Sequence, residues 1–342
     1  MRSALVLGFG QIGTQIAHDL AAAGTDVRVM TRSRPEGLAV TVTAVAHRAG
    51  LDSPASHSGT EHADPAAGSE TVPGTEPVAT APGRISWSQG DASSPEAVRR
   101  AAEEIGAEAI FACVHTAYDS RVWARTLPGL EAAILDAAAA LDLPVVFPES
   151  VYAFAGLTTP ITADADFAPV EEKGRIRRQL LEARSAHSAQ VASVLAGDLI
   201  GATASPSSSV VRLCITDRIA AGRRAVVPAR TDVPHGITVI DDMAAAMIAV
   251  AQLLESGEGV HRLIIAPSAN PTLADVAAYT HDAVGTPYRT PIALPHAAVR
   301  ATGWFDRSMF ELAELAPIWR RPCRIESDTE SDWRAGIDAM LR

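Results

Sequence analysis

The sequence predicts an α/β protein built on a parallel, doubly wound sheet. Short apolar stretches typical of buried strands alternate with stretches typical of helices, and this alternation favours parallel strands joined by helices. The expected strands lie at residues 3–7, 26–31, 85–91, 109–114, 145–147 and 191–195. A glycine motif directly after the first of these strands supports the same fold class.

The motif Gly8-Phe9-Gly10-Gln11-Ile12-Gly13 lies between an expected strand and an expected helix. In that context the G-x-G-x-x-G spacing predicts a dinucleotide site. Gly8 allows the tight turn, Gly10 lets the backbone approach a pyrophosphate, and Gly13 lets the helix pack closely on the strand. The N–H groups at the start of the helix, at Gln11 and Ile12, are expected to face the phosphates.

The choice of dinucleotide is expected to depend on the end of the second strand, where Arg32, Ser33 and Arg34 follow one another. An acidic residue there would bind the ribose 2′-hydroxyl of NAD, whereas an arginine accommodates the 2′-phosphate of NADP. Arg32 and Ser33 therefore predict NADP, with NAD as the less favoured cofactor.

Composition narrows the class of partner. The chain has 342 residues and a formal net charge of −11, which argues against nucleic acid because binding to phosphates requires basic surface. Its three cysteines are widely spaced and indicate neither disulfides nor a zinc site, so no metal is expected. No apolar run reaches the roughly 18 residues of a membrane span. The first strand begins at residue 3, which leaves no room for a signal peptide, so we expect a cytoplasmic protein with a small-molecule substrate.

Two regions are predicted. Residues 1–195 are expected to form a Rossmann domain, and residues 196–342 a smaller substrate-binding region, because the spacing becomes irregular after Gly197. A strand near residues 261–266 is expected to return to the sheet. Residues 51–83 hold no Lys or Arg and show no apolar periodicity, so a flexible acidic insertion is expected there.

Further segments form a recognisable series along the chain. They are Gly90-Asp91-Ala92, Cys113-Val114-His115-Thr116, Glu149-Ser150-Val151-Tyr152, Lys173-Gly174-Arg175-Ile176-Arg177, Ala196–Gly201 and Thr238–Ala244. Their order and spacing resemble the extended short-chain dehydrogenase/reductases of the NAD(P)-dependent epimerase/dehydratase type. The resemblance implies that Asp91 and Ala92 contact the adenine and that Cys113 and His115 flank the cofactor. It also implies a homodimer, and action on a hydroxyl or carbonyl of a nucleotide sugar or secondary metabolite.

The expected catalytic dyad is altered. The resemblance implies a Tyr with a Lys four residues later, and none of the four tyrosines has one. Lys173 takes the Tyr position and Arg177 the Lys position. Three interpretations stay open: Lys173 is the acid/base, with a pKa lowered by burial and by Arg177; Tyr152 substitutes, with Ser150 or Glu149 orienting the substrate; or the site is inactive. Under each of them Arg177 binds the ribose or pyrophosphate as a fixed charge.

The predicted function is accordingly an NADP-dependent oxidoreductase or epimerase. The alternative is a non-catalytic sensor that binds NADP(H) and reports its redox state to a partner protein. A third possibility is a structural protein with a vestigial pocket. His115 stays open between a proton-transfer group and a structural histidine, and Asp241 and Asp242 are expected to cap a helix rather than to bind a metal.

Overall fold

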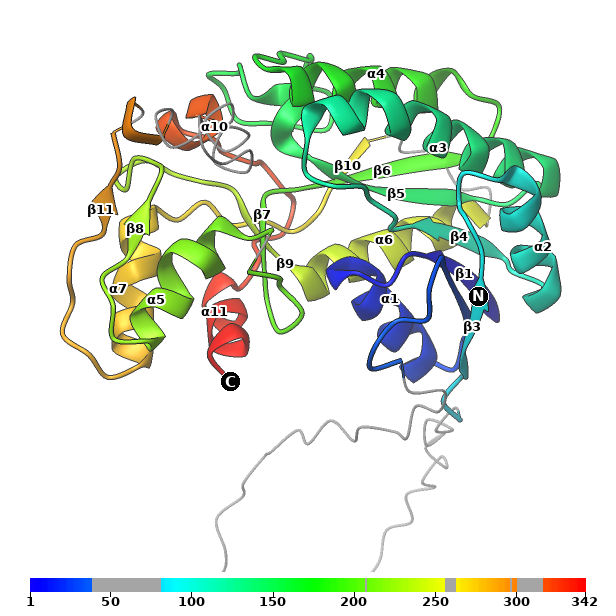
Figure 1. Ribbon diagram of the computed structural model, residues 1–342, viewed down its shortest axis with the longest axis horizontal. Coiled ribbons are helices and arrows are strands. Elements are labelled where there is room, and N and C mark those ends of the chain that lie inside the picture. The colour runs from blue at the N-terminus through cyan, green and yellow to red at the C-terminus, as the bar shows by residue number, and fades with distance from the viewer. Residues whose placement is uncertain (39–80, 207, 256–262, 296, 300–315) are drawn as a thin grey trace, which may run out of the picture.

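The computed structural model describes residues 1–38, 81–206, 208–255, 263–295, 297–299 and 316–342 (Figure 1). Its centre is a seven-stranded parallel sheet in the order β10-β6-β5-β4-β1-β2-β3, which confirms the predicted fold class. The strands are β1 (Ser3–Leu7), β2 (Asp26–Thr31), β3 (Ile85–Gln89), β4 (Ala109–Ala112), β5 (Val145–Ser150), β6 (Val191–Ala196) and β10 (Leu263–Ile265).

Helices cover both faces of this sheet (Figure 1). They are α1 (Gln11–Ala22) and α6 (Ile240–Glu255) on one face, and α2 (Pro95–Ile105), α3 (Ser120–Leu141) and α4 (Glu172–Ala186) on the other. Alternate side chains of β1 show why Ala4, Leu5, Val6 and Leu7 are all apolar. Val6 packs in the core shared with α1 and α6, whereas Leu7 packs in the core shared with α2 and α3. A strand covered on both faces has no polar side.

The hydrophobic core of the C-terminal region includes Ile219, Val276, Trp333 and Ile337, and it is shared with residues of the first region such as Val151, Phe154, Leu181 and Leu195. Its strands pair in parallel as β7 (Asp198–Ile200) with β9 (Ile237–Val239) and β8 (Val226–Val227) with β11 (Ile292–Ala293). Its helices are the π-helical η2 (Arg212–Thr216), α5 (Asp217–Ala220), α7 (Leu273–Ala283), α10 (Ala316–Arg320) and α11 (Trp333–Leu341). β10 pairs with β6 and so extends the central sheet, while the division at residue 195 stays a prediction.

Acidic residues lie at the starts of two helices. Helix α3 begins at Ser120, because the Asp119 side chain accepts the N–H groups of Arg121 and Val122 and caps it. Helix α6 begins at Ile240, which places Asp241 and Asp242 in its first turn. The acidic insertion lies outside the described residues, except for residues 81–83. Among the helices described, none is long and apolar enough to cross a membrane.

A buried arginine joins helices α3 and α4 to the sheet. Arg184 donates two hydrogen bonds to the carboxylate of Glu131 on α3, both at 2.7 Å. Its Nη1 donates to Glu149 on β5 at 3.0 Å and to Ser193 on β6 at 2.9 Å. The side chains of Arg184 and Glu149 are 2% and 0% exposed. Charges this deep persist only when they are paired.

We therefore expect Arg184→Met to lower the free energy of unfolding by about 3–5 kcal/mol, because Glu131 and Glu149 would stay buried without this partner. Denaturant titration measures the loss. The control is Arg178→Met on the same helix, which removes an exposed ion pair with Glu182 and should cost less than about 1 kcal/mol. Equal losses in the two variants would contradict the assigned role of Arg184.

Candidate functional site

The loops that carry the predicted residues meet at one edge of the sheet. β1 lies between β2 and β4, so the chain runs outward from β1 in two directions, and ligands of such sheets bind where the carboxyl ends separate. The glycine motif follows β1 and His115 follows β4. Tyr152 lies in the short 3₁₀ helix η1 (Val151–Phe154), directly after β5.

Two of the three motif glycines are required by close backbone contacts. Gly8 has a φ of +93°, and a Cβ there would lie 2.7 Å from the carbonyl oxygen of Cys113. A Cβ on Gly13 would lie 2.4 Å from the carbonyl oxygen of Gly8. Gly10 differs, because a Cβ there would meet nothing within 4 Å, and no side chain caps the helix that starts after it. The start of α1 therefore faces open space, which fits a pyrophosphate.

A loop of the C-terminal region lies against this motif, a contact that the sequence did not predict. The side-chain oxygen of Gln11 accepts hydrogen bonds from the Ser205 N–H and the Ser208 hydroxyl, both at 3.0 Å. The Thr203 hydroxyl donates to the Gln11 carbonyl at 3.0 Å. Asp198 anchors the far end of this loop by accepting the Val211 N–H at 2.9 Å. Serines and threonines are frequent in the loop, but no motif marks them in the sequence.

The part of the site that is expected to bind the adenosine of the cofactor is exposed. Arg32 and Asp91 are both exposed, and Ala92 is buried. Asp91 accepts the N–H and the hydroxyl of Ser93 at 3.0 and 2.8 Å. These bonds lower the pKa of Asp91, and the charge of Arg32 adds to the effect. Asp91 is therefore ionised and close enough to Arg32 for their charges to interact.

Lys173 is enclosed by aromatic rings. Its side chain is buried, with Nζ 4.4 Å from the centroid of the Tyr118 ring and 5.7 Å from that of Trp123. A cation over aromatic faces is stabilised electrostatically. Because Lys173 is fully buried and the Tyr118 ring covers Nζ, direct proton transfer from Lys173 to a substrate would require neighbouring side chains to move.

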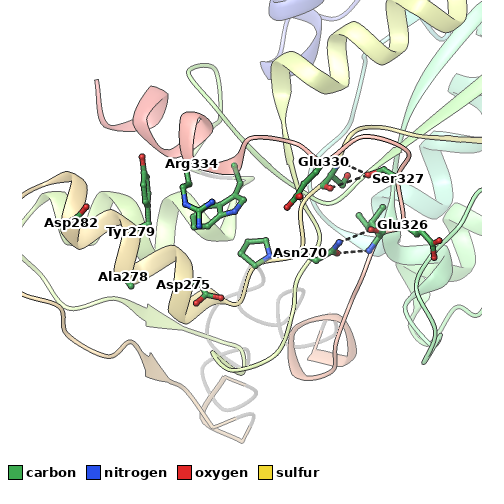
Figure 2. Close-up of a pocket in the computed structure, with 13 residues that line it drawn as sticks. Asn270, Asp275, Ala278, Tyr279, Asp282, Glu326, Ser327, Glu330 and Arg334 are labelled. Carbon is green, nitrogen blue, oxygen red and sulfur yellow. Dashed lines mark hydrogen bonds between the residues drawn. The ribbon is translucent and has the colours of Figure 1, made fainter.

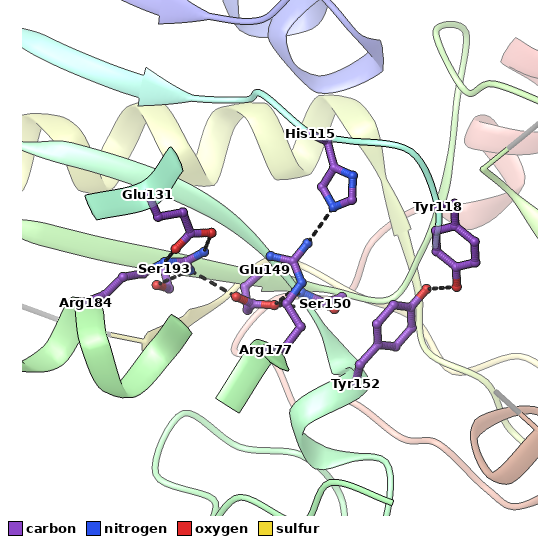
Figure 3. A network of polar contacts seen from close by, with 9 residues as sticks. All are labelled: His115, Tyr118, Glu131, Glu149, Ser150, Tyr152, Arg177, Arg184 and Ser193. Carbon is purple, nitrogen blue, oxygen red and sulfur yellow. Dashed lines mark hydrogen bonds and ion pairs between the residues drawn. The ribbon is translucent and has the colours of Figure 1, made fainter. Parts of the chain in front are cut away.

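Tyr152 and Tyr118 are joined through their hydroxyl groups at 3.0 Å (Figure 3). Burial raises the pKa of Tyr152 to about 12, with the hydrogen bond from Tyr118 opposing the effect. Desolvation, with the nearby Tyr152, also raises the pKa of Tyr118. Both phenols are therefore protonated at neutral pH. Trp123 stacks on Tyr152 with a centroid distance of 6.3 Å and holds the pair in place.

Arg177 and His115 form a second pair in the same place (Figure 3). Nη2 of Arg177 lies 3.0 Å from Nε2 of His115, and Nε lies 3.5 Å from the Glu149 carboxylate. Glu149 thus contacts both Arg177 and Arg184, so it belongs to the buried charge network and is not free to orient a substrate. Ser150 remains beside it, with its N–H donating to Glu149 at 2.8 Å.

Cys113 contributes packing to the site. Burial raises the pKa of its thiol to about 12, so the thiol stays protonated. A Cβ added to Gly13 would lie 3.2 Å from the Cβ of Cys113, so the Cys113 side chain lies against the glycine motif.

A cavity of about 850 Å³ lies elsewhere, between α7 and the segment that precedes α11 (Figure 2). Its lining includes Asp275, Tyr279, Asp282, Glu326, Glu330 and Arg334. None of the site residues predicted from the sequence lines it.

Comparisons with known proteins establish the fold. No protein-family model matches the sequence, and no curated protein matches it. Among solved structures, the chain is similar to UDP-glucose 4-epimerase from Thermotoga maritima with UDP-glucose, at 11% identity and a TM-score of 0.65, over 99% of this chain and 97% of that one. It is also similar to dTDP-glucose 4,6-dehydratase from Bacillus anthracis in complex with NAD, at 11% identity and a TM-score of 0.66, over 100% and 96% of the two chains.

A third similar structure is the UDP-glucose 4-epimerase of Thermus thermophilus in complex with NAD, at 15% identity and a TM-score of 0.59, over 99% of this chain and 97% of that one. Identities this low establish the fold alone. The chain has the fold of nucleotide-sugar epimerases and dehydratases, which confirms at that level its resemblance to the extended short-chain dehydrogenase/reductases.

Proposed function

We propose that this protein is an NADP-dependent oxidoreductase or epimerase that acts on a hydroxyl or carbonyl group of a small molecule such as a nucleotide sugar. One observation carries the proposal. Gly8 and Gly13 are fixed by close backbone contacts, whereas Gly10 and the uncapped start of α1 face open space at the carboxyl edge of the sheet. The similar structures with UDP-glucose or NAD support the same class of ligand.

The proposal assigns a contact to each part of the cofactor. N–H groups at Gly10, Gln11 and Ile12 would hold the pyrophosphate. Arg177 would contact the nicotinamide ribose as a permanent cation. At the other end Asp91 and Ala92 would flank the adenine. When bound, the cofactor accepts or supplies a hydride.

The preference for NADP over NAD is the finer part of the proposal. Arg32 and Ser33 are exposed directly after β2, where a 2′-phosphate would lie. No carboxylate occupies positions 31–35 to bind a 2′-hydroxyl instead. NAD is the cofactor carried by two of the similar structures, so the distinction depends on these two side chains.

Tyr152 is the proton donor that the geometry supports best. Its phenol keeps its proton at neutral pH and contacts the phenol of Tyr118, which is 42% exposed. A proton given from Tyr152 to a carbonyl oxygen can be replaced along its hydrogen bond with the Tyr118 hydroxyl. Lys173 acts beneath this pair as a buried cation against the Tyr118 ring.

A non-catalytic NADP(H) sensor is the second candidate function. It is favoured by the enclosure of Lys173, which stands where the resemblance implies the catalytic Tyr, behind the rings of Tyr118 and Trp123. A sensor would bind the dinucleotide without turnover of any carbonyl substrate.

The cofactor preference is tested by calorimetric titration with NADPH and NADH. Arg32→Ala should weaken NADPH binding by about tenfold to a hundredfold and leave NADH binding unchanged, because a charged hydrogen bond to a phosphate contributes about 1.5–3 kcal/mol. Arg99→Ala, at an exposed arginine on α2, is the control for loss of charge. Equal weakening of both nucleotides would remove the NADP assignment.

The location of the site is tested by Gly10→Asp. The new carboxylate would occupy the open space and repel a pyrophosphate, so nucleotide affinity should fall by about a hundredfold or more. The melting temperature should change little, because the side chain meets no protein atom. Gly129→Asp, at an exposed glycine of α3 that also faces open space, is the matched control. Unchanged binding in Gly10→Asp would support a vestigial pocket.

The catalytic role of Tyr152 is tested by a screen of carbonyl substrates that follows NADPH consumption. Tyr152→Phe should lower turnover by about 10²-fold to 10⁴-fold, the usual contribution of a positioned general acid, without weakening NADPH binding. Tyr288→Phe, at a tyrosine that is 50% exposed, should have no effect. NADPH binding without turnover in the wild type would favour the sensor.

A further inference from the structure

The ring of His115 is held in one tautomer by its two neighbours. Its Nδ1 lies 2.8 Å from the carbonyl oxygen of Thr116, which can only accept, so Nδ1 carries the proton. Its Nε2 lies 3.0 Å from Nη2 of Arg177, which can only donate, so Nε2 is the acceptor. Both ring nitrogens are therefore engaged by protein atoms.

Arg177 is in turn held from behind by Glu149. The Glu149 side chain is 0% exposed, with one oxygen 3.5 Å from Nε of Arg177 and the other accepting from Arg184 at 3.0 Å. The ring of Trp123, 5.0 Å from the Arg177 guanidinium, covers one of its faces. If Arg177 turned away from His115, it would lose its ion pair with the buried carboxylate of Glu149.

The charges around His115 oppose its protonation. Arg177 on α4 faces the ring directly, Trp123 on α3 packs edge-on against it, and Glu131 on α3 is the carboxylate whose charge acts on it. Desolvation of the ring and then the charge of Arg177 lower the pKa of His115 to about 4, with the Thr116 carbonyl and Glu131 opposing. His115 is therefore neutral at physiological pH.

We propose that Glu149 is a positioning residue, which holds Arg177 against His115 and so fixes the cation that the proposed function places beside the nicotinamide half of the cofactor. His115 then has no part in proton transfer. The assignment of the ligand rests on the proposed function, whereas the positioning by Glu149 is a property of the protein without ligand. Among the described residues Nη1 of Arg177 makes no hydrogen bond, which leaves it for that contact.

The positioning is tested first on the full, nucleotide-free chain. NMR of histidines labelled at the ring nitrogens reports the tautomer, and His115→Gln identifies the signal among the ten histidines. In the wild type His115 should show a protonated Nδ1 and a bare Nε2 from neutral pH down to about pH 5. In Glu149→Gln the chemical shifts of the two ring nitrogens should move towards the average for the two tautomers, because Arg177 loses its ion pair with Glu149.

Two variants separate charge from shape. Glu149→Asp keeps the carboxylate and should keep most of the wild-type tautomer. Glu182→Gln removes a carboxylate from an exposed ion pair on the same helix as Arg177 and should leave His115 unchanged. A merely structural role for Glu149 would lower the melting temperature and leave the tautomer as it is, which would overturn the proposal.

The cofactor part is tested by fluorescence titration with NADPH. Glu149→Gln should weaken binding by roughly tenfold, as expected for one misplaced charged contact, and Glu182→Gln should not. A changed tautomer with unchanged affinity would overturn the cofactor contact and support the positioning. If the wild type binds no dinucleotide, the proposed function fails, and the NMR result still decides the positioning.

Arg177→Lys covers the case in which Glu149→Gln does not fold. The lysine keeps the charge, but it lacks the planar fork that reaches Glu149 and His115 together. In this variant His115 should exchange between its two tautomers, and NADPH binding should be weakened as much as in Glu149→Gln. Wild-type behaviour in both measurements would overturn the proposal.

Discussion

The interaction on which the site depends is the pairing of charges behind it. Glu131, Arg184, Glu149 and Arg177 alternate in sign and are all buried, and taking each of them out of water costs several kcal/mol unless its partner is in place. That requirement fixes α3, α4 and β5 relative to one another. The position of Arg177 beside His115 at the edge of the sheet then follows from the core.

The glycine motif shows how much local sequence can determine. Its spacing between a strand and a helix predicts both the turn at Gly8 and the close packing at Gly13, since each constraint lies within a few residues of the motif. The parallel, doubly wound sheet follows in the same way from the alternation of strands and helices along the chain. The contact of Gln11 with Ser205 and Ser208 cannot be predicted from such patterns, because it joins segments that are far apart in the sequence.

The charge network escaped sequence analysis for a similar reason. Arg184 reads as a surface arginine in an arginine-rich chain, and Glu131 reads as a solvated residue on a helix. Their pairing depends on two helices packing side by side, which no local periodicity encodes. Arg177 could be placed by its spacing from Lys173, but the reason for its orientation, Glu149, becomes visible only when β5 lies beneath α4.

The residue types on α4 bear on the proton transfer that we propose for Tyr152. A lysine ammonium close to a phenol oxygen stabilises the phenolate and lowers the pKa of the phenol, so that the phenolate is available as a base nearer to neutral pH. Here Lys173 lies over the ring of Tyr118, and burial keeps the pKa of Tyr152 at about 12. A phenol in that state holds its proton until a stronger base receives it. This protonation state agrees with the role that we propose for Tyr152, which is to protonate an oxygen that gains negative charge during reduction of a carbonyl.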